Sequence, residues 1–173
     1  MIVVSGPVEV AYASGVEVVP VVSTEEMLAA AQRIFPTCDG LIGVAAPCDY
    51  RPVKVAEGKI NKTGQPLMLE LIETPDVVAT LGAAKERGRQ WCVGFALETD
   101  DHRLRALAKL EKKHCDLMVS NGAAAMNALD TSVEVIAPDG AVLASLAGSK
   151  QSVADGIFQV IQSRLIAARA AAR

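Results

Sequence analysis

The chain has 173 residues, of which 51% are hydrophobic, 21% are charged and 3% are aromatic, and its formal net charge is −3. This is the composition of one soluble globular domain, and a chain of this length buries roughly 70% of its extended surface on folding without disulfide or metal cross-links. The acidic balance argues against a nucleic-acid-binding surface, and no apolar run is long enough to span a membrane.

The start of the chain and its cysteines point to a cytoplasmic protein. No basic residue precedes Arg33, so the charged segment that begins a signal peptide is lacking. The four cysteines form no C-x-x-C pair, as expected for reduced thiols in the cytosol.

Apolar segments rich in Val and Ile alternate with segments of helical periodicity along the chain. This alternation predicts an α/β fold, with a three-layer, mostly parallel sheet covered by helices on both faces and a C-terminal hairpin. The strand over residues 40–46 is apolar at every position, so we expect it to be central and buried on both faces. We expect strands over residues 2–4, 16–22, 40–46, 67–72, 91–96 and 116–120, a hairpin of residues 132–137 and 142–146, and helices over 23–35, 74–88, 100–113 and 152–168.

Two of these helices begin with capping signals. Ser23 and Glu26 have the spacing of a capping box, in which each side chain accepts a hydrogen bond from the backbone of the other residue. Thr74 is expected to cap the next helix with its hydroxyl, and Pro75 takes the first helical position. In the last helix, an apolar stripe predicts one buried face, formed by Val153, Ile157, Val160, Ile161 and Leu165.

The long loop over residues 47–64 is the first candidate site, because long ordered loops in compact domains tend to be functional. Asp49 could hold a magnesium ion or a ribose hydroxyl, although a turn-capping role is the more common one. Lys59 and Lys62 lie between glycines and could neutralise a polyphosphate, although loop lysines are usually only solvated.

Ligands of open parallel sheets bind beyond the carboxyl ends of the strands. Four segments are expected there, over residues 45–49, 73–78, 95–99 and 120–122. The helix that starts near Thr74 offers backbone N–H groups to an anion, as every helix start does. Lys109 and Lys113 share one helix face, where cations also simply complement the helix dipole.

Other catalytic patterns are missing from the sequence. The two histidines, His102 and His114, suggest neither a zinc site nor a Ser-His-Asp arrangement, and His114 fits a helix cap better than a catalytic base. Neither a P-loop nor a G-x-G-x-x-G motif is present. The residues alone therefore predict an α/β domain with a cationic loop and an anion site at the strand ends.

Six segments, taken in order, resemble the phosphopantothenoylcysteine synthetase family, the ligase half of the bifunctional bacterial coenzyme A flavoprotein. The resemblance covers nearly the whole chain. The segments are VSGPV (4–8), AAPCDYRP (45–52), GKINK (58–62), LMLELIETPDVV (67–78), VGFALET (93–99) and LAKLEKKHCDLMVSN (107–121).

The resemblance implies an enzyme of coenzyme A biosynthesis that joins 4'-phosphopantothenate with L-cysteine. The carboxylate of phosphopantothenate attacks the α-phosphorus of CTP, pyrophosphate leaves, and the amine of cysteine displaces CMP from the acyl cytidylate. The resemblance further implies magnesium as cofactor, no flavin within this domain, association with a phosphopantothenoylcysteine decarboxylase flavoprotein domain, and a homodimer. We expect residues 67–72 and the hairpin around Asp139 to lie in the dimer interface, because an apolar alternating strand at a sheet edge seeks a partner.

Site residues follow from the same resemblance, position by position. Lys59 and Asn121 are the expected catalytic residues, with Asn121 on the substrate side, and Asp49 is the expected metal ligand. The expected nucleotide contacts are Asp49, Lys59, Pro75, Asp76, Val77, Val78, Phe95, Lys109 and Lys113.

The resemblance begins at the family's second strand. We therefore interpret residues 1–173 as a single synthetase-like domain without the family's first strand, phosphate-binding turn and helix, and we expect this chain alone to be inactive even where it binds CTP. Two hypotheses follow: a synthetase whose first unit lies elsewhere, or a catalytically inactive nucleotide-binding or interaction module. Asp49, Lys59, Lys109 and Lys113 favour the synthetase.

Overall fold

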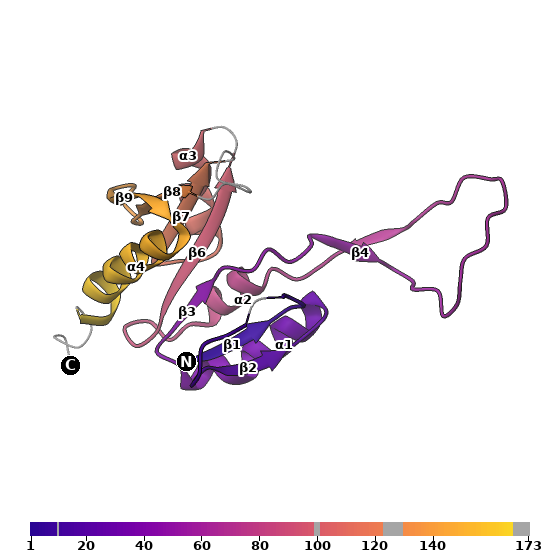
Figure 1. The fold of residues 1–173 in the computed structure, drawn as a ribbon, viewed down its shortest axis with the longest axis horizontal. Helices are drawn as coiled ribbons and strands as arrows, with labels where there is room; N and C mark the ends of the chain where they lie inside the picture. The colour runs from indigo at the N-terminus through magenta and orange to yellow at the C-terminus, as the bar shows by residue number, and fades with distance from the viewer. Residues whose placement is uncertain (10, 99–100, 123–129, 168–173) are drawn as a thin grey trace. The chain divides into compact units, whose positions relative to one another are not determined.

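The computed structural model describes residues 1–9, 11–98, 101–122 and 130–167, and Figure 1 shows the ribbon. The chain divides into two compact units, which are described separately. Unit 1 comprises Met1–Ala31 and Ala45–Val77, and unit 2 comprises Gln32–Val44 and Val78–Arg173. Asp100, the predicted first residue of one helix, and Ala168, the predicted last residue of another, lie outside the described residues.

Unit 1 begins with a parallel strand pair and a helix. β1 (Ile2–Ser5) pairs with β2 (Glu17–Pro20), and α1 (Thr24–Ile34) follows. The predicted capping box is confirmed: the Glu26 N–H donates to Ser23 Oγ at 3.1 Å, and the Ser23 N–H donates to Glu26 Oε2 at 3.1 Å. These two bonds satisfy backbone donors that have no partner within the helix.

The rest of unit 1 is a long two-stranded arm. β4 (Tyr50–Pro52) pairs antiparallel with β5 (Leu71–Glu73), and the loop over residues 53–70 joins them beyond the strands (Figure 1). The strand expected over residues 67–72 is therefore wrong in extent, because only its last two residues belong to β5. A ribbon of two strands has no second layer on which to bury apolar side chains. All side chains of residues 53–70 are accordingly exposed.

Unit 2 contains the main sheet, whose strands are ordered β3-β6-β7-β8-β9. β3, β6 and β7 run parallel, and β8 and β9 add the predicted hairpin in antiparallel pairing. The sheet strands are β3 (Gly40–Gly43), β6 (Trp91–Glu98), β7 (Leu117–Gly122), β8 (Asp130–Ile136) and β9 (Val142–Ser149). The helical segments are the 3-10 turn Phe35–Thr37, α2 (Val77–Ala84), α3 (His102–Lys112), α4 (Lys150–Ile161) and the π-helical turn Gln162–Ala167.

Side-chain alternation along the strands creates two cores, one on each face of this sheet. Trp91, Val93, Leu117 and Val119 pack with α4. On the other face, the core with α3 is formed by Cys92, Ala96, Ala106, Leu110, Cys115, Met118 and Ile136. The predicted stripe of the last helix faces the first core, with Val153, Ile157, Ile161 and Leu165 buried and Val160 partly buried. The predicted α/β class with helices on both faces of the sheet is thus confirmed.

Two further expectations are wrong in this fold. The segment over residues 40–46 forms a strand only as far as Gly43, and this strand is at the edge of the main sheet rather than at its centre. The Thr74 hydroxyl donates to the carbonyl of Cys48 instead of capping a helix, and α2 begins three residues later. Within the described residues, no helix is both long and apolar enough to cross a membrane.

We predict that Gly40→Ala destabilises unit 2. A Cβ atom at Gly40 would lie 2.1 Å from Cδ2 of the Trp91 ring, so the indole must shift within a packed core. Such overpacking typically costs about 1–3 kcal/mol in the free energy of unfolding. Urea unfolding followed by circular dichroism measures the change. Gly58→Ala is the matched control, because a Cβ there meets no atom within 4 Å; equal midpoints for the two variants would contradict the prediction.

Candidate functional site

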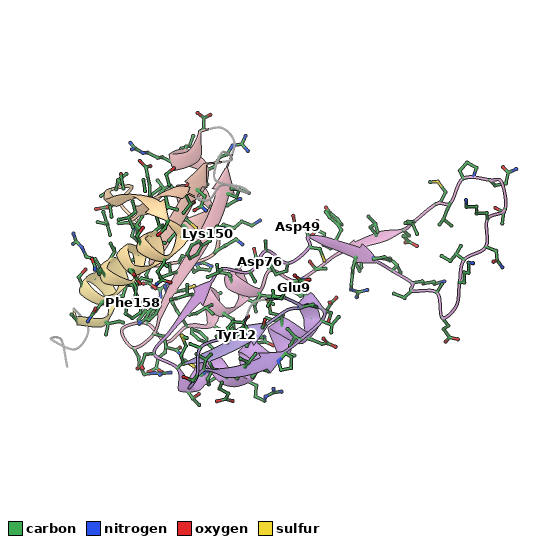
Figure 2. All side chains as sticks on the ribbon, viewed as in Figure 1. Glu9, Tyr12, Asp49, Asp76, Lys150 and Phe158 are labelled. Atoms are coloured by element: carbon green, nitrogen blue, oxygen red, sulfur yellow. The ribbon has the colours of Figure 1, made fainter. Side chains whose placement is uncertain are left out.

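Asp49 and the residues around Asp76 meet at the base of the arm. The Thr74 N–H donates to the Asp49 carbonyl at 2.9 Å, and the Thr74 hydroxyl donates to the Cys48 carbonyl. One residue further along the ribbon, the Tyr50 hydroxyl donates to Glu73 Oε1 at 3.2 Å. These bonds connect the two sides of the arm at its base, where Figure 2 labels Asp49 and Asp76.

The side chains at this base are suited to a solvent-facing ligand. The carboxylates of Asp49 and Asp76 are exposed, Pro75 is half-buried, and Val77 is buried in the first turn of α2. The backbone over residues 75–78 leads directly into the amino terminus of that helix. The backbone bonds of Thr74 thus bring the segments that contain Asp49 and residues 75–77 side by side.

A salt bridge holds the arm strand to the first helix of the same unit. The Arg51 guanidinium pairs with the carboxylate of Glu25. The pKa of Glu25 is lowered, first by a backbone hydrogen bond and then by this bond with Arg51. Sequence reasoning missed this pair, because 26 residues separate its members. Arg51 stands two residues after Asp49, so the pair restrains the start of β4.

Lys59 and Lys62 lie elsewhere on the arm. Both are exposed in the loop over residues 53–70, beyond β4 and β5, and neither takes part in an ion pair within the described part of the chain. The structure therefore does not bring Lys59 next to Asp49. It keeps both cations in solvent, where their charge is free to meet an anionic ligand.

The remaining predicted residues belong to unit 2 and lie on opposite faces of its sheet. Phe95 is half-buried and packs on the α4 side. Lys109 and Lys113 lie at the end of α3, on the other side, where the Lys113 N–H donates to the Lys109 carbonyl at 2.9 Å. Val78, at the start of α2, contacts the core on the α3 side. The sheet thus separates the Phe95 side chain from the two lysines.

Asn121 stands near the carboxyl end of β7, one residue after Ser120. Asn121 Oδ1 and Ser120 Oγ are both buried and have no hydrogen-bond partner within the described residues. Buried polar atoms without partners are uncommon in folded proteins, and they mark places where a further polar group fits. Asn121 was predicted as a site residue, and Ser120 belongs to the same predicted strand-end segment without a role of its own, because a serine in a strand has no distinguishing pattern.

An open cavity of about 800 Å³ borders Ser120 on the α3 side of the hairpin. Across it, Arg103 donates two hydrogen bonds to the Glu134 carboxylate, at 2.8 and 2.6 Å, which raise the pKa of Arg103. The other lining residues are Asp101, Leu104, Ser132, Val133, Ser145, Leu146 and Ala147. Glu134 neutralises the positive charge of Arg103, so Arg103 adds no net positive charge to the cavity.

The chain is thus of the α/β class, with an exposed arm that carries lysines in unit 1 and a sheet with polar groups at a strand end in unit 2. A model of the family described as "DNA/pantothenate metabolism flavoprotein C-terminal domain" matches residues 1–165. The chain belongs to this family.

Curated relatives and solved structures agree with this membership. The chain is 33% identical over 162 residues to the coenzyme A biosynthesis bifunctional protein CoaBC of Vibrio parahaemolyticus, covering 90% of this chain and 40% of that protein. It is 37% identical over 162 residues to the CoaBC protein of Mycobacterium bovis, covering 88% of this chain and 38% of that protein. The chain therefore spans about two fifths of the length of these relatives.

Among solved structures, a C-terminal domain of a CoaBC protein superposes with a TM-score of 0.76 at 31% identity, covering 95% of this chain and 75% of that domain. The DNA/pantothenate metabolism flavoprotein from Streptococcus pneumoniae shares the fold at 17% identity, with a TM-score of 0.73, covering 94% of this chain and 79% of that one.

Proposed function

We propose that this chain carries the ligase activity of coenzyme A biosynthesis, which joins 4'-phosphopantothenate with L-cysteine and consumes CTP. The observation that carries the proposal is the match of residues 1–165 to the flavoprotein C-terminal domain family, supported by CoaBC relatives. A Cab2 variant in complex with phosphopantothenate-cysteine shares the fold at 17% identity, with a TM-score of 0.68, covering 86% of this chain and 52% of that one.

The reaction needs an activated carboxylate, because a carboxylate is a poor acyl electrophile. In the proposed sequence the phosphopantothenate carboxylate attacks the α-phosphorus of CTP, which forms an acyl cytidylate and releases pyrophosphate. The amine of cysteine then attacks the acyl carbon, an amide bond forms and CMP leaves. Both steps build negative charge on phosphate oxygens, so cations and N–H donors at fixed positions supply the main part of catalysis.

The arm and its base contain the first proposed contacts of the nucleotide. Lys59 neutralises the polyphosphate, and the backbone of residues 75–78 offers N–H groups from the start of α2. Phe95, Lys109 and Lys113 are further proposed nucleotide contacts, assigned on the family motifs and not on a shared position, because the sheet separates Phe95 from the two lysines. Asn121 is proposed to act on the acyl side, because its buried Oδ1 has no partner within the described residues.

Asp49 is the proposed protein ligand for magnesium. No group of three or more His, Cys, Asp or Glu side chains suited to a metal occurs in the described ranges. A single exposed carboxylate nevertheless fits this ion, which usually takes one or two carboxylates and completes its shell with phosphates and waters. When bound, magnesium would withdraw negative charge from the nucleotide phosphates.

A catalytically inactive nucleotide-binding or interaction module is the second candidate, because Lys59 lies along the arm from Asp49 rather than beside it.

Pyrophosphate release separates the two functions. The complete gene product that carries residues 1–173 is incubated with CTP and magnesium, and phosphopantothenate and cysteine are added singly and together. A ligase forms phosphopantothenoylcysteine in step with pyrophosphate when both are present. Binding of CTP without product formation favours the module.

We predict that Lys59→Ala weakens binding of CTP with magnesium about 10- to 150-fold, as expected for loss of one charged hydrogen bond worth about 1.5–3 kcal/mol. Isothermal titration calorimetry measures the affinity. Lys54→Ala is the matched control, because Lys54 is an exposed lysine of the same arm with no proposed contact. Equal affinities for the two variants would remove Lys59 from the nucleotide site.

The partners we propose are a second copy of the chain and a phosphopantothenoylcysteine decarboxylase domain, the latter because the CoaBC relatives are bifunctional. Residues 67–72 of the arm and the hairpin around Asp139 are the proposed dimer contacts, and Leu67, Met68 and Leu69 are 64%, 88% and 62% exposed. Apolar side chains gathered on an exposed loop mark a surface that a partner can cover.

We predict a dimer in sedimentation velocity, and we expect Met68→Glu to convert it to a monomer, since a carboxylate would be buried without a partner. Leu104→Glu is the control, because Leu104 is 71% exposed on α3, which is not part of the arm. A monomeric parent protein at tens of micromolar, on the order of usual assay concentrations, would rule out a stable interface.

A further inference from the structure

Two buried cysteines face each other in unit 2, and the proposed ligase chemistry uses neither. Cys92 is the second residue of β6, and Cys115 lies in the turn before β7; they are 0% and 5% exposed. Their Sγ atoms are 3.7 Å apart, within the core on the α3 side of the sheet.

Backbone hydrogen bonds hold the two cysteines in this arrangement. The Asp116 N–H donates to the Cys92 carbonyl at 2.7 Å, and the Cys92 N–H donates to Asp116 Oδ2 at 2.7 Å. Gly94 leaves room for the sulfur, because a Cβ at that position would lie 3.0 Å from Cys115 Sγ. The pair is thus positioned by the β6–β7 junction itself.

The electrostatic surroundings make the two thiols unequal. The pKa of Cys115 is lowered, first by its hydrogen bond with the Cys92 thiol, and further because Lys85 and Lys113 are nearby. The pKa of Cys92 is raised by the same hydrogen bond and by burial. Lys85 is fixed in place, since its Nζ donates to Asp116 Oδ2 at 2.6 Å and to the His114 carbonyl at 2.7 Å. Cys115 is therefore the better nucleophile of the pair.

We propose that Cys92 and Cys115 form an oxidative modification site, in which a small peroxide converts the pair into an intrachain disulfide between β6 and the start of β7. The two sulfurs must approach from 3.7 Å to about 2.05 Å, the length of a disulfide bond. The backbone on both sides is already hydrogen-bonded, so the proposal requires side-chain rotation to supply this movement.

The oxidation balances with hydrogen peroxide as the oxidant. The Cys115 thiolate attacks one peroxide oxygen, the O–O bond breaks, and hydroxide leaves and takes up a proton, which gives a sulfenic acid and water. The sulfur of Cys92 then attacks the sulfenic sulfur, the S–S bond forms, and the displaced hydroxide leaves as water with the proton of Cys92. Two thiols and one peroxide become one disulfide and two waters.

Peptide mapping tests the proposal on the unmodified full chain. The native protein is exposed to hydrogen peroxide, free thiols are blocked with iodoacetamide in denaturant, and tryptic peptides are analysed by mass spectrometry without reduction. Trypsin separates Cys92 in residues 90–103 from Cys115 in residues 114–150, and leaves Cys38 and Cys48 together in residues 34–54. We expect a cross-link between peptides 90–103 and 114–150 that lacks two hydrogens and disappears on reduction with dithiothreitol.

Controls distinguish this disulfide from general thiol oxidation. The double variant Cys38→Ser/Cys48→Ser should keep the cross-link, and Cys92→Ala should abolish it. The peptide map of the parent protein is decisive by itself, so the test holds even where Cys92→Ala folds poorly. The proposal is overturned when Cys92 and Cys115 are alkylated as free thiols at a peroxide dose that oxidises the exposed Cys48, or when the cross-link joins two chains rather than one.

Discussion

Burial of β6 and β7 on both faces is the constraint on which the rest of unit 2 depends. Their apolar side chains alternate between a core with α4 and a core with α3, so the central part of each strand is buried on both faces. Polar side chains lie toward the end of β7 instead. There, the buried side-chain oxygens of Ser120 and Asn121 have no hydrogen-bond partner within the described residues. The same alternation puts Phe95 on one side of the sheet and the lysines of α3 on the other.

Local signals in the sequence predicted local structure well. The capping box of Ser23 and Glu26, the β8–β9 hairpin and the apolar stripe of α4 each depend on residues close in the chain, and each is confirmed. Patterns that depend on distant partners were less informative. The uniformly apolar segment after Gly40 suggested a central strand, yet among the described strands β3 pairs only with β6, which puts it at the edge of the sheet. Thr74 had a partner 26 residues away, and no helix-start pattern contains that information.

The candidate site was predictable as a set of residue types and less so as an arrangement. Asp49 and Asp76 come together because the bonds of Thr74 close the base of the arm. Lys59 does not join them, since the arm strands extend the chain away from that base before the loop turns back. The roles of Lys109 and Lys113 came from family motifs, because cations at the end of a helix also occur for electrostatic reasons alone. The Cys92 and Cys115 pair had no sequence signature, as 23 residues separate the two thiols.

The contact between Gly40 and Trp91 gives the molecule an intrinsic optical probe. Trp91 is the single tryptophan of the chain and is 9% exposed, with its indole against the backbone of β3. Its fluorescence emission therefore reports the solvation of the β3–β6 junction, and both of these strands belong to unit 2. Circular dichroism, which registers helices and strands throughout the chain, has no such restriction. Comparing the two signals during denaturation would show whether the two units unfold together or in sequence.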